Sequence, residues 1–228
     1  MDQMQQIYGF DGVNQIARHR VLRNTYWLLA LSMIPTIIGA IVGVQTGFFI
    51  GGGLMGFVIF MAIAFGFFFA IDKTKNSGLG VAFLLGFTFF MGLMLSGMIG
   101  AVLHNFVNGA ALIMIAFGGT ASILGVMATI ATVSKRDFTG MGHWLFAGLL
   151  MIIVASVLNI FLHLPALYLV ISVVSIAIFS AYILFDVQQI IKGGETNYIT
   201  ATLRIYLDVY NIFVNLLSLL SIVAGDRR

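Results

Sequence analysis

A chain of 228 residues that is 61% hydrophobic and 8% charged, with a mean hydropathy of +1.08, is too apolar for a water-soluble domain. Its apolar stretches reach the roughly 20 residues that span a bilayer as a helix, and they do not alternate as the strands of a transmembrane barrel do. The absence of cysteine excludes disulfides and cysteine-bound metals, and the small net charge of +3 gives no indication of nucleic-acid binding.

Residues 1–22 are polar and of mixed character, and we expect them to form a mobile cytoplasmic tail ahead of a transmembrane domain over residues 23–225. Within that domain the sequence predicts an all-α bundle of seven transmembrane helices. The predicted segments run over about residues 25–44, 51–71, 78–102, 109–133, 144–162, 166–186 and 203–223. Because the connectors are short, neighbouring helices are expected to pack as antiparallel hairpins in one bundle.

Basic residues fall in alternate loops. Arginines precede the first segment, and Lys or Arg follows the second, fourth and sixth segments, whereas the loops between carry neither: 45–50, 103–108 and 163–165. The positive-inside rule therefore predicts a cytoplasmic N-terminus and, after seven spans, a periplasmic C-terminus. Arg227 and Arg228 run against this rule, so a re-entrant last segment remains the alternative.

The last segment is the most polar one. Its polar residues are spaced by 4, 3, 4 and 3 positions, which places them on one narrow helix face: Arg204, Asp208, Asn211, Asn215 and Ser218. A polar stripe inside a membrane turns toward protein or water rather than toward lipid. The last helix is therefore expected to be central in the bundle.

Two aspartates interrupt the last two apolar segments, Asp186 in the sixth and Asp208 in the seventh. Ionisable groups within a bilayer cost at least a few kcal/mol, so they are interpreted first as functional. Both are expected near the cytoplasmic side, and two carboxylates held close cannot both ionise cheaply, so the pair is expected to titrate as a unit. This predicts a pH-sensing gate and a weak or transient calcium site, because calcium prefers oxygen ligands. The polar residues predicted to accompany it are Tyr182, Arg204, Asn211, Asn215 and Ser218.

A structural interpretation of the same residues stays open. Arg204 could pair with Asp208, Asp186 could be solvated or paired with Lys192, and the asparagines of the stripe could bond between helices. The sequence contains no P-loop, His-Glu-x-x-His, Ser/His/Asp or Rossmann glycine pattern. The chain is therefore predicted not to be an enzyme and to hold no cofactor apart from the calcium considered above.

The C-terminal block Phe185-Asp-Val-Gln-Gln-Ile-Ile, with Leu203-Arg-Ile-Tyr-Leu-Asp-Val-Tyr-Asn-Ile-Phe, resembles the signature of the Bax inhibitor-1 family. Three further motifs look like the bacterial YccA branch of that family: Val21-Leu-Arg-Asn-Thr-Tyr, Asn159-Ile-Phe-Leu-His-Leu-Pro-Ala-Leu and Gly193-Gly-Glu-Thr-Asn-Tyr-Ile. Together with the seven apolar segments, the resemblance extends over nearly the whole chain.

The resemblance implies a last helix surrounded by six others and a pH-sensitive calcium leak controlled by an aspartate pair, which maps onto Asp186 and Asp208. For the YccA branch it implies an inner-membrane protein that binds and restrains the membrane AAA+ metalloprotease FtsH, partly through the N-terminal tail. The expected partners are thus the lipid bilayer, calcium ions and the FtsH complex.

The sequence departs from the family in one respect. Members proposed as leak channels carry an arginine in the second span that latches onto the aspartates, and residues 51–71 contain no basic residue. The nearest basic candidates for this role are Arg204, Lys73 and Lys75.

Overall fold

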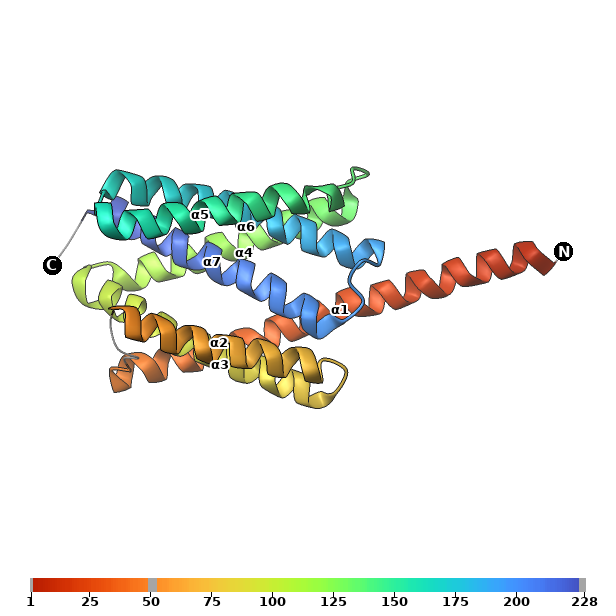
Figure 1. The fold of residues 1–228 in the computed structure, drawn as a ribbon, viewed down its shortest axis with the longest axis horizontal. Helices are drawn as coiled ribbons and strands as arrows, with labels where there is room; N and C mark the ends of the chain where they lie inside the picture. The colour runs from red at the N-terminus through yellow and green to blue at the C-terminus, as the bar shows by residue number, and fades with distance from the viewer. Residues whose placement is uncertain (1, 49–52, 226–228) are drawn as a thin grey trace.

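The computed structural model describes residues 2–48 and 53–225. It contains seven long helices, each with a stretch long and apolar enough to cross a membrane (Figure 1). The helices are α1 (Asp2–Thr46), α2 (Gly53–Thr74), α3 (Gly78–Asn105), α4 (Gly109–Val133), α5 (Gly142–Leu162), α6 (Pro165–Lys192) and α7 (Tyr198–Ala224), with a short 3-10 helix η1 (Thr139–Met141) before α5. The predicted all-α bundle of seven spans is confirmed.

The first helix is longer than expected. It begins at Asp2, so residues 2–22, which were expected to form a tail ahead of the first segment, belong to α1. Alanine, arginine and leucine over residues 17–23 favour helix, which explains why the helix extends to the N-terminal side of the apolar segment predicted at 25–44. The N-terminal part of α1 projects away from the bundle (Figure 1). The predicted start of the second segment, at residues 51–52, lies outside the described residues.

The last helix, α7, lies in the middle of the bundle, between α1–α3 on one side and α4 and α6 on the other (Figure 1). Fully buried side chains lie along its length, among them Ile205, Ile212 and Leu217. In the described part of the chain α7 contacts every other helix except α5, which packs on α6. The predicted central position is confirmed, although α7 contacts five helices and not six.

Consecutive helices do not all form hairpins, contrary to expectation. Over residues 2–48 and 53–225, neither α1 and α2 nor α4 and α5 pack against each other; α1 lies instead along α3. Glycines set this choice, because small residues let helix backbones approach closely in a membrane. A Cβ atom at Gly39 would overlap the carbonyl oxygen of Phe89, and one at Gly92 would overlap that of Thr36.

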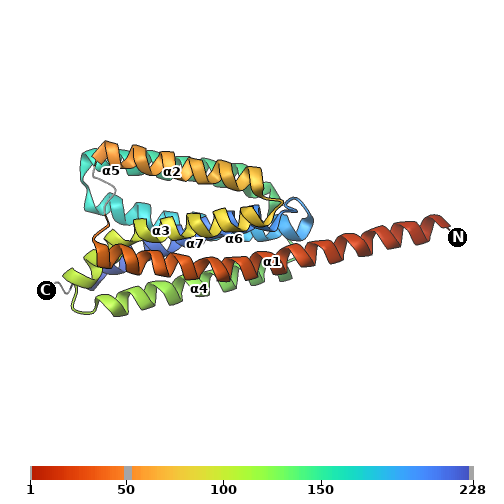
Figure 2. The same cartoon turned by 90° about the horizontal axis from the view of Figure 1, so that it is seen from below.

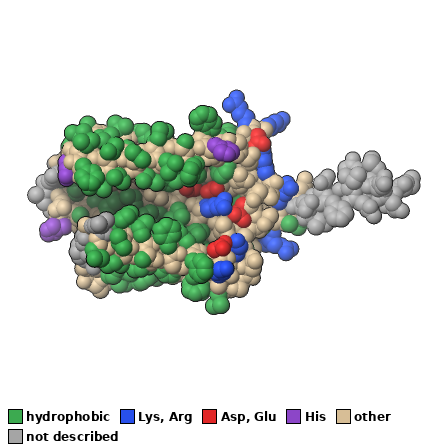
Figure 3. Space-filling view, viewed as in Figure 1, with side chains coloured by type: hydrophobic (Ala, Val, Ile, Leu, Met, Phe, Trp, Pro, Cys, Tyr) green, Lys and Arg blue, Asp and Glu red, His purple; other side chains and the backbone are tan. Residues whose placement is uncertain are grey.

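The loops that follow α2, α4 and α6 lie at the same end of the bundle as the projecting part of α1, and we call this the basic end (Figures 1 and 2). Lysine and arginine side chains gather there, whereas hydrophobic side chains cover the flanks of the bundle (Figure 3). Trp27 and Trp144 are 73% and 82% exposed and lie toward the basic ends of α1 and α5. Exposed tryptophans in this position suit a membrane–water interface.

The contact between α1 and α3 generates a prediction. Gly92→Ala should lower the free energy of unfolding by about 1–3 kcal/mol, because the added methyl group overlaps the backbone of α1. Thermal unfolding in detergent measures the effect. Gly97→Ala is the matched control, since a Cβ atom there meets open space on the same helix. Equal stability of the two variants would contradict close α1–α3 packing.

Candidate functional site: a buried carboxyl pair between two helices

The two aspartates come together because α6 and α7 form a tight hairpin. Helix α6 ends at Lys192, where Gly193 takes the left-handed conformation (φ 82°), and α7 begins at Tyr198. Both helices are longer than the predicted 166–186 and 203–223, because local caps set their ends. As a result, Asp186 lies inside α6 and not at its end, at a level where Asp208 of α7 faces it.

The side chains of Asp186 and Asp208 are 7% and 6% exposed, and their carboxyl groups lie within hydrogen-bonding reach of each other. Oδ2 of Asp208 is buried and meets no N–H or O–H donor of the described residues. The phenol of Tyr182, one turn before Asp186 on α6, is near both carboxyl groups. The structure therefore brings Asp186 and Asp208 together, with Tyr182 one helical turn from Asp186.

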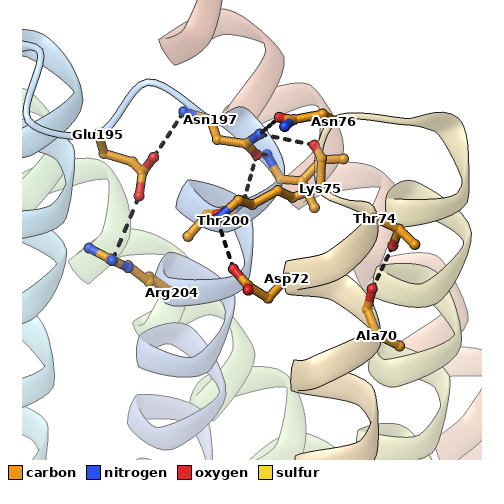
Figure 4. Close-up of polar contacts among 10 residues, drawn as sticks. Ala70, Asp72, Thr74, Lys75, Asn76, Glu195, Asn197, Thr200 and Arg204 are labelled. Atoms are coloured by element: carbon orange, nitrogen blue, oxygen red, sulfur yellow. Dashed lines mark hydrogen bonds and ion pairs between the residues drawn. The ribbon is translucent and has the colours of Figure 1, made fainter.

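The ion pairs considered for the aspartates are not the ones that form. Arg204 is half-exposed and faces Glu195, with Nη2 3.7 Å from Oε2 (Figure 4). The positive charge of Arg204 also acts on both aspartates. Nζ of Lys192 is 2.7 Å from Oδ1 of Asp137 in the loop after α4. Neither Lys192 nor Arg204 therefore forms its ion pair with an aspartate of the carboxyl pair.

The other two basic candidates for a latch are engaged elsewhere. Nζ of Lys75 is 2.8 Å from Oδ1 of Asp72, one turn earlier on the chain. Nζ of Lys73 lies 5.5 Å from the centre of the Phe69 ring. Arg204 is therefore the basic residue that comes nearest to the role of the missing arginine in the second span.

The remaining residues of the polar stripe form hydrogen bonds with the backbone of α7 or, for Ser218, with a side chain of α6. The amide nitrogens of Asn211 and Asn215 each donate to the carbonyl oxygen four residues earlier, at 2.8 Å, and do not donate across helices. Ser218, near the other end of α7, accepts a hydrogen bond from the hydroxyl of Tyr168 on α6 at 2.9 Å. These three residues share a helix face with Asp208, and these hydrogen bonds go to groups other than the carboxyl pair.

Asn197, which was not singled out from the sequence, organises the loop beside the pair (Figure 4). Its side-chain oxygen accepts from the backbone N–H groups of Ile199 and Thr200 and so caps α7, and its Nδ2 donates to the carbonyl oxygen of Lys75 at 2.9 Å. The α6–α7 loop is thereby joined to the α2–α3 loop. An asparagine just ahead of an apolar segment is a recognised capping signal and predicts this role.

Gln188 ties the third loop of the basic end to α6. Its side chain is 2% exposed, accepts from the backbone N–H of Phe138, and donates to the carbonyl oxygen of Arg136 at 2.7 Å. Beside it, the hydrogen bond from Lys192 holds the pKa of Asp137 well below its usual range, so this surface ion pair persists at neutral pH. The α4–α5 loop is therefore fastened to α6 within two residues of Asp186.

A resident metal would need more ligands than the pair supplies. Among the described residues, no three His, Cys, Asp or Glu side chains gather into a group that could hold a metal ion. Calcium takes six to eight oxygens, so two carboxyl groups would require carbonyl, phenol or water oxygens to complete its shell.

The Gln188 contact is testable. Gln188→Met should speed amide exchange at Phe138 and destabilise the loop by about 1–3 kcal/mol, because a backbone N–H and a backbone carbonyl lose their partner. Hydrogen–deuterium exchange with mass spectrometry measures this. The control is Gln189→Met, the same change one residue later. Unchanged exchange in both variants would mean that the loop is held by other contacts.

Comparison with known proteins assigns the family. A family model described as "Inhibitor of apoptosis-promoting Bax1" matches residues 18–225. The "Modulator of FtsH protease YccA" of Escherichia coli is 37% identical over 222 residues, covering 95% of this chain and 96% of that protein. An "Uncharacterized membrane protein" of Vibrio cholerae is 36% identical, covering 91% and 92%, and an uncharacterized protein of Helicobacter pylori is 33% identical, covering 90% and 87%. With its seven spans and this match over almost its whole length, the chain belongs to the Bax inhibitor-1 family.

Proposed function

We propose that this protein is a non-enzymatic modulator of a membrane protease of the FtsH type, in the bacterial inner membrane. The observation that supports this most strongly is the 37% identity with a protein named as such a modulator, which extends over 96% of that relative. Because the two proteins align over almost their whole length, a surface that binds a partner in one can have its counterpart in the other.

The projecting part of α1 is the surface that we assign to the protease. Arg18 packs against Gly193 at the turn after α6, so the helix is attached to the bundle up to that residue and extends beyond it (Figure 1). The positive-inside rule, applied to Arg18, Arg20 and Arg23, supports a cytoplasmic position for this end and a periplasmic one for the C-terminus. A helical extension from an anchored bundle is well suited to reach a neighbouring membrane protein.

The test is degradation of a membrane substrate by purified FtsH in proteoliposomes, with and without this protein. The full chain should slow degradation several-fold and co-purify with the protease. Deletion of residues 2–14 should abolish both effects while leaving the thermal unfolding temperature unchanged, since the bundle begins beyond them. Gly97→Ala, a change on α3 at a position where a Cβ atom meets open space, is the matched control. Full restraint by the deletion variant would contradict the role of the extension.

The buried carboxyl pair supports a second function, a cation leak controlled by pH. When one carboxyl group carries a proton it can donate to the other and hold α6 against α7; when both are ionised they repel and the helices separate. Asn211, Asn215 and Ser218 then line the way along α7, and Tyr182 stands beside the pair. Arg204, held by Glu195 3.7 Å away, takes the place of the absent arginine in the second span.

Calcium flux into liposomes between pH 6 and 8 tests this second function. The wild type should pass calcium with a clear dependence on pH, and Asp186→Asn or Asp208→Asn should change the flux several-fold and flatten that dependence, because one titrating carboxyl group is gone. Asp137→Asn removes a carboxylate at the same end outside the pair and should leave the profile unaltered. A wild type without flux would rule out the leak and leave the modulator role standing.

A further inference from the structure

An apolar groove of about 740 Å³ opens between α1 and α4, which run along the same edge of the bundle in Figure 2. The two helices do not pack directly on each other within the described residues, so the groove separates them. Residues of α3 contribute to one wall, and α7 forms the floor with Tyr206 and Tyr210. The groove is distinct from the carboxyl pair, which lies between α6 and α7.

The groove offers almost nothing to a polar ligand. Its walls are aliphatic and aromatic, for example Met33 and Ile37 on α1 and Phe117 on α4. Two of the polar groups that line it are engaged within the protein: Oγ1 of Thr36 lies 2.9 Å from the hydroxyl of Tyr206, and Thr120 donates to the backbone of its own helix. The amide of Gln45 lines the groove near the opposite end of α1 from Tyr26. The occupant is therefore expected to be apolar along the groove.

One end of the groove is basic. Tyr26 belongs both to the groove and to an open depression lined by Ile16, His19, Arg20, Leu22 and Arg23 of α1. Among the residues whose side chains the structure describes, no acidic side chain lines this depression. Residues 16, 19, 20, 23, 26, 30, 33 and 37 recur at helical spacing and share one face of α1. That face is basic before Tyr26 and apolar after it.

We propose that the groove binds one acyl chain of an anionic phospholipid, with the phosphate of the headgroup held by Arg20 and Arg23. A basic mouth that leads into an apolar channel fits a ligand with an anionic head and an apolar tail, and basic pockets beside transmembrane helices take anionic lipid headgroups. Along α1 the groove runs from Tyr26 to Gln45, about 28 Å of helix. An acyl chain that enters at the basic mouth is expected to occupy the part next to Tyr26, because one leaflet is about half of the roughly 30 Å hydrocarbon core.

The charge at the mouth of the groove favours a lipid over a helix. An anionic phospholipid carries its phosphate directly above its acyl chains, which matches Arg20 and Arg23 beside an apolar lining. A partner helix would fill the apolar lining without supplying an anionic group at that position.

The headgroup contact is tested by native mass spectrometry of the detergent-solubilised full chain, titrated with phosphatidylglycerol or phosphatidylcholine. The wild type should retain phosphatidylglycerol in preference. Arg20→Gln with Arg23→Gln should reduce that retention about tenfold or more and leave phosphatidylcholine unchanged, since each basic residue near a membrane surface adds attraction for an anionic lipid. Lys135→Gln with Arg136→Gln removes two exposed charges at the same end outside the lining and serves as the control. Equal retention of the two lipids, or equal loss in both double variants, would overturn the proposal.

A pair of variants on α4 tests the contact between the acyl chain and the groove. Gly118 lines the groove and Gly125 does not, and a Cβ atom at either position meets open space, so both variants should fold. Gly118→Phe should fill the groove and abolish lipid retention, whereas Gly125→Phe should keep it. Thermal unfolding confirms that both are folded. Retention by Gly118→Phe would show that the lipid binds elsewhere.

Photo-crosslinking in the native membrane distinguishes the occupants. A photoreactive amino acid placed at Ala121, which lines the groove, should yield an adduct with the mass of a phospholipid. An adduct with a polypeptide in its place would overturn the lipid assignment and give the groove to a partner helix.

Discussion

The main constraint on the bundle is the burial of two carboxyl groups at a place where neither lipid nor bulk water can form hydrogen bonds with them. Asp186 and Asp208 satisfy this constraint by facing each other from α6 and α7. An unpaired buried charge costs far more than a hydrogen-bonded one, so the register of these two helices is strongly constrained. Gly193 ends α6 and Asn197 starts α7, and these two caps set the hairpin that brings the aspartates to one level.

The contacts of the basic end converge on that hairpin. Gln188 joins it to the loop after α4, Asn197 joins it to the loop after α2, and Arg18 of α1 packs against Gly193. A change in the spacing of α6 and α7 would therefore reach every loop on this side, including the base of the projecting part of α1. The proposed gate and the proposed protease contact share one mechanical element, so the two functions are physically compatible on a single protein.

The groove between α1 and α4 is also lined by α7, the helix that carries Asp208. Tyr206 forms part of its floor and lies two residues before Asp208, while its hydroxyl is paired with Thr36 of α1. A lipid chain in the groove would thus contact the helix that carries one member of the carboxyl pair. Under this proposal the lipid composition of the surrounding leaflet would affect the packing of α7 without any contact between lipid and the aspartates.

The sequence by itself determined the seven spans, the central place of α7 and the approach of Asp186 to Asp208, because hydropathy, helical spacing and one short loop are local properties. Its expectations were wrong where the outcome depended on distant residues. Only the tertiary structure decided that α1 packs on α3 and not on α2, since the fit of Gly39 and Gly92 against facing backbones has no local signal. It also decided that Arg204 faces Glu195 and Lys192 faces Asp137, because an ion pair forms with whichever partner the fold brings nearest. The groove, which arises where two helices fail to meet, follows from packing alone.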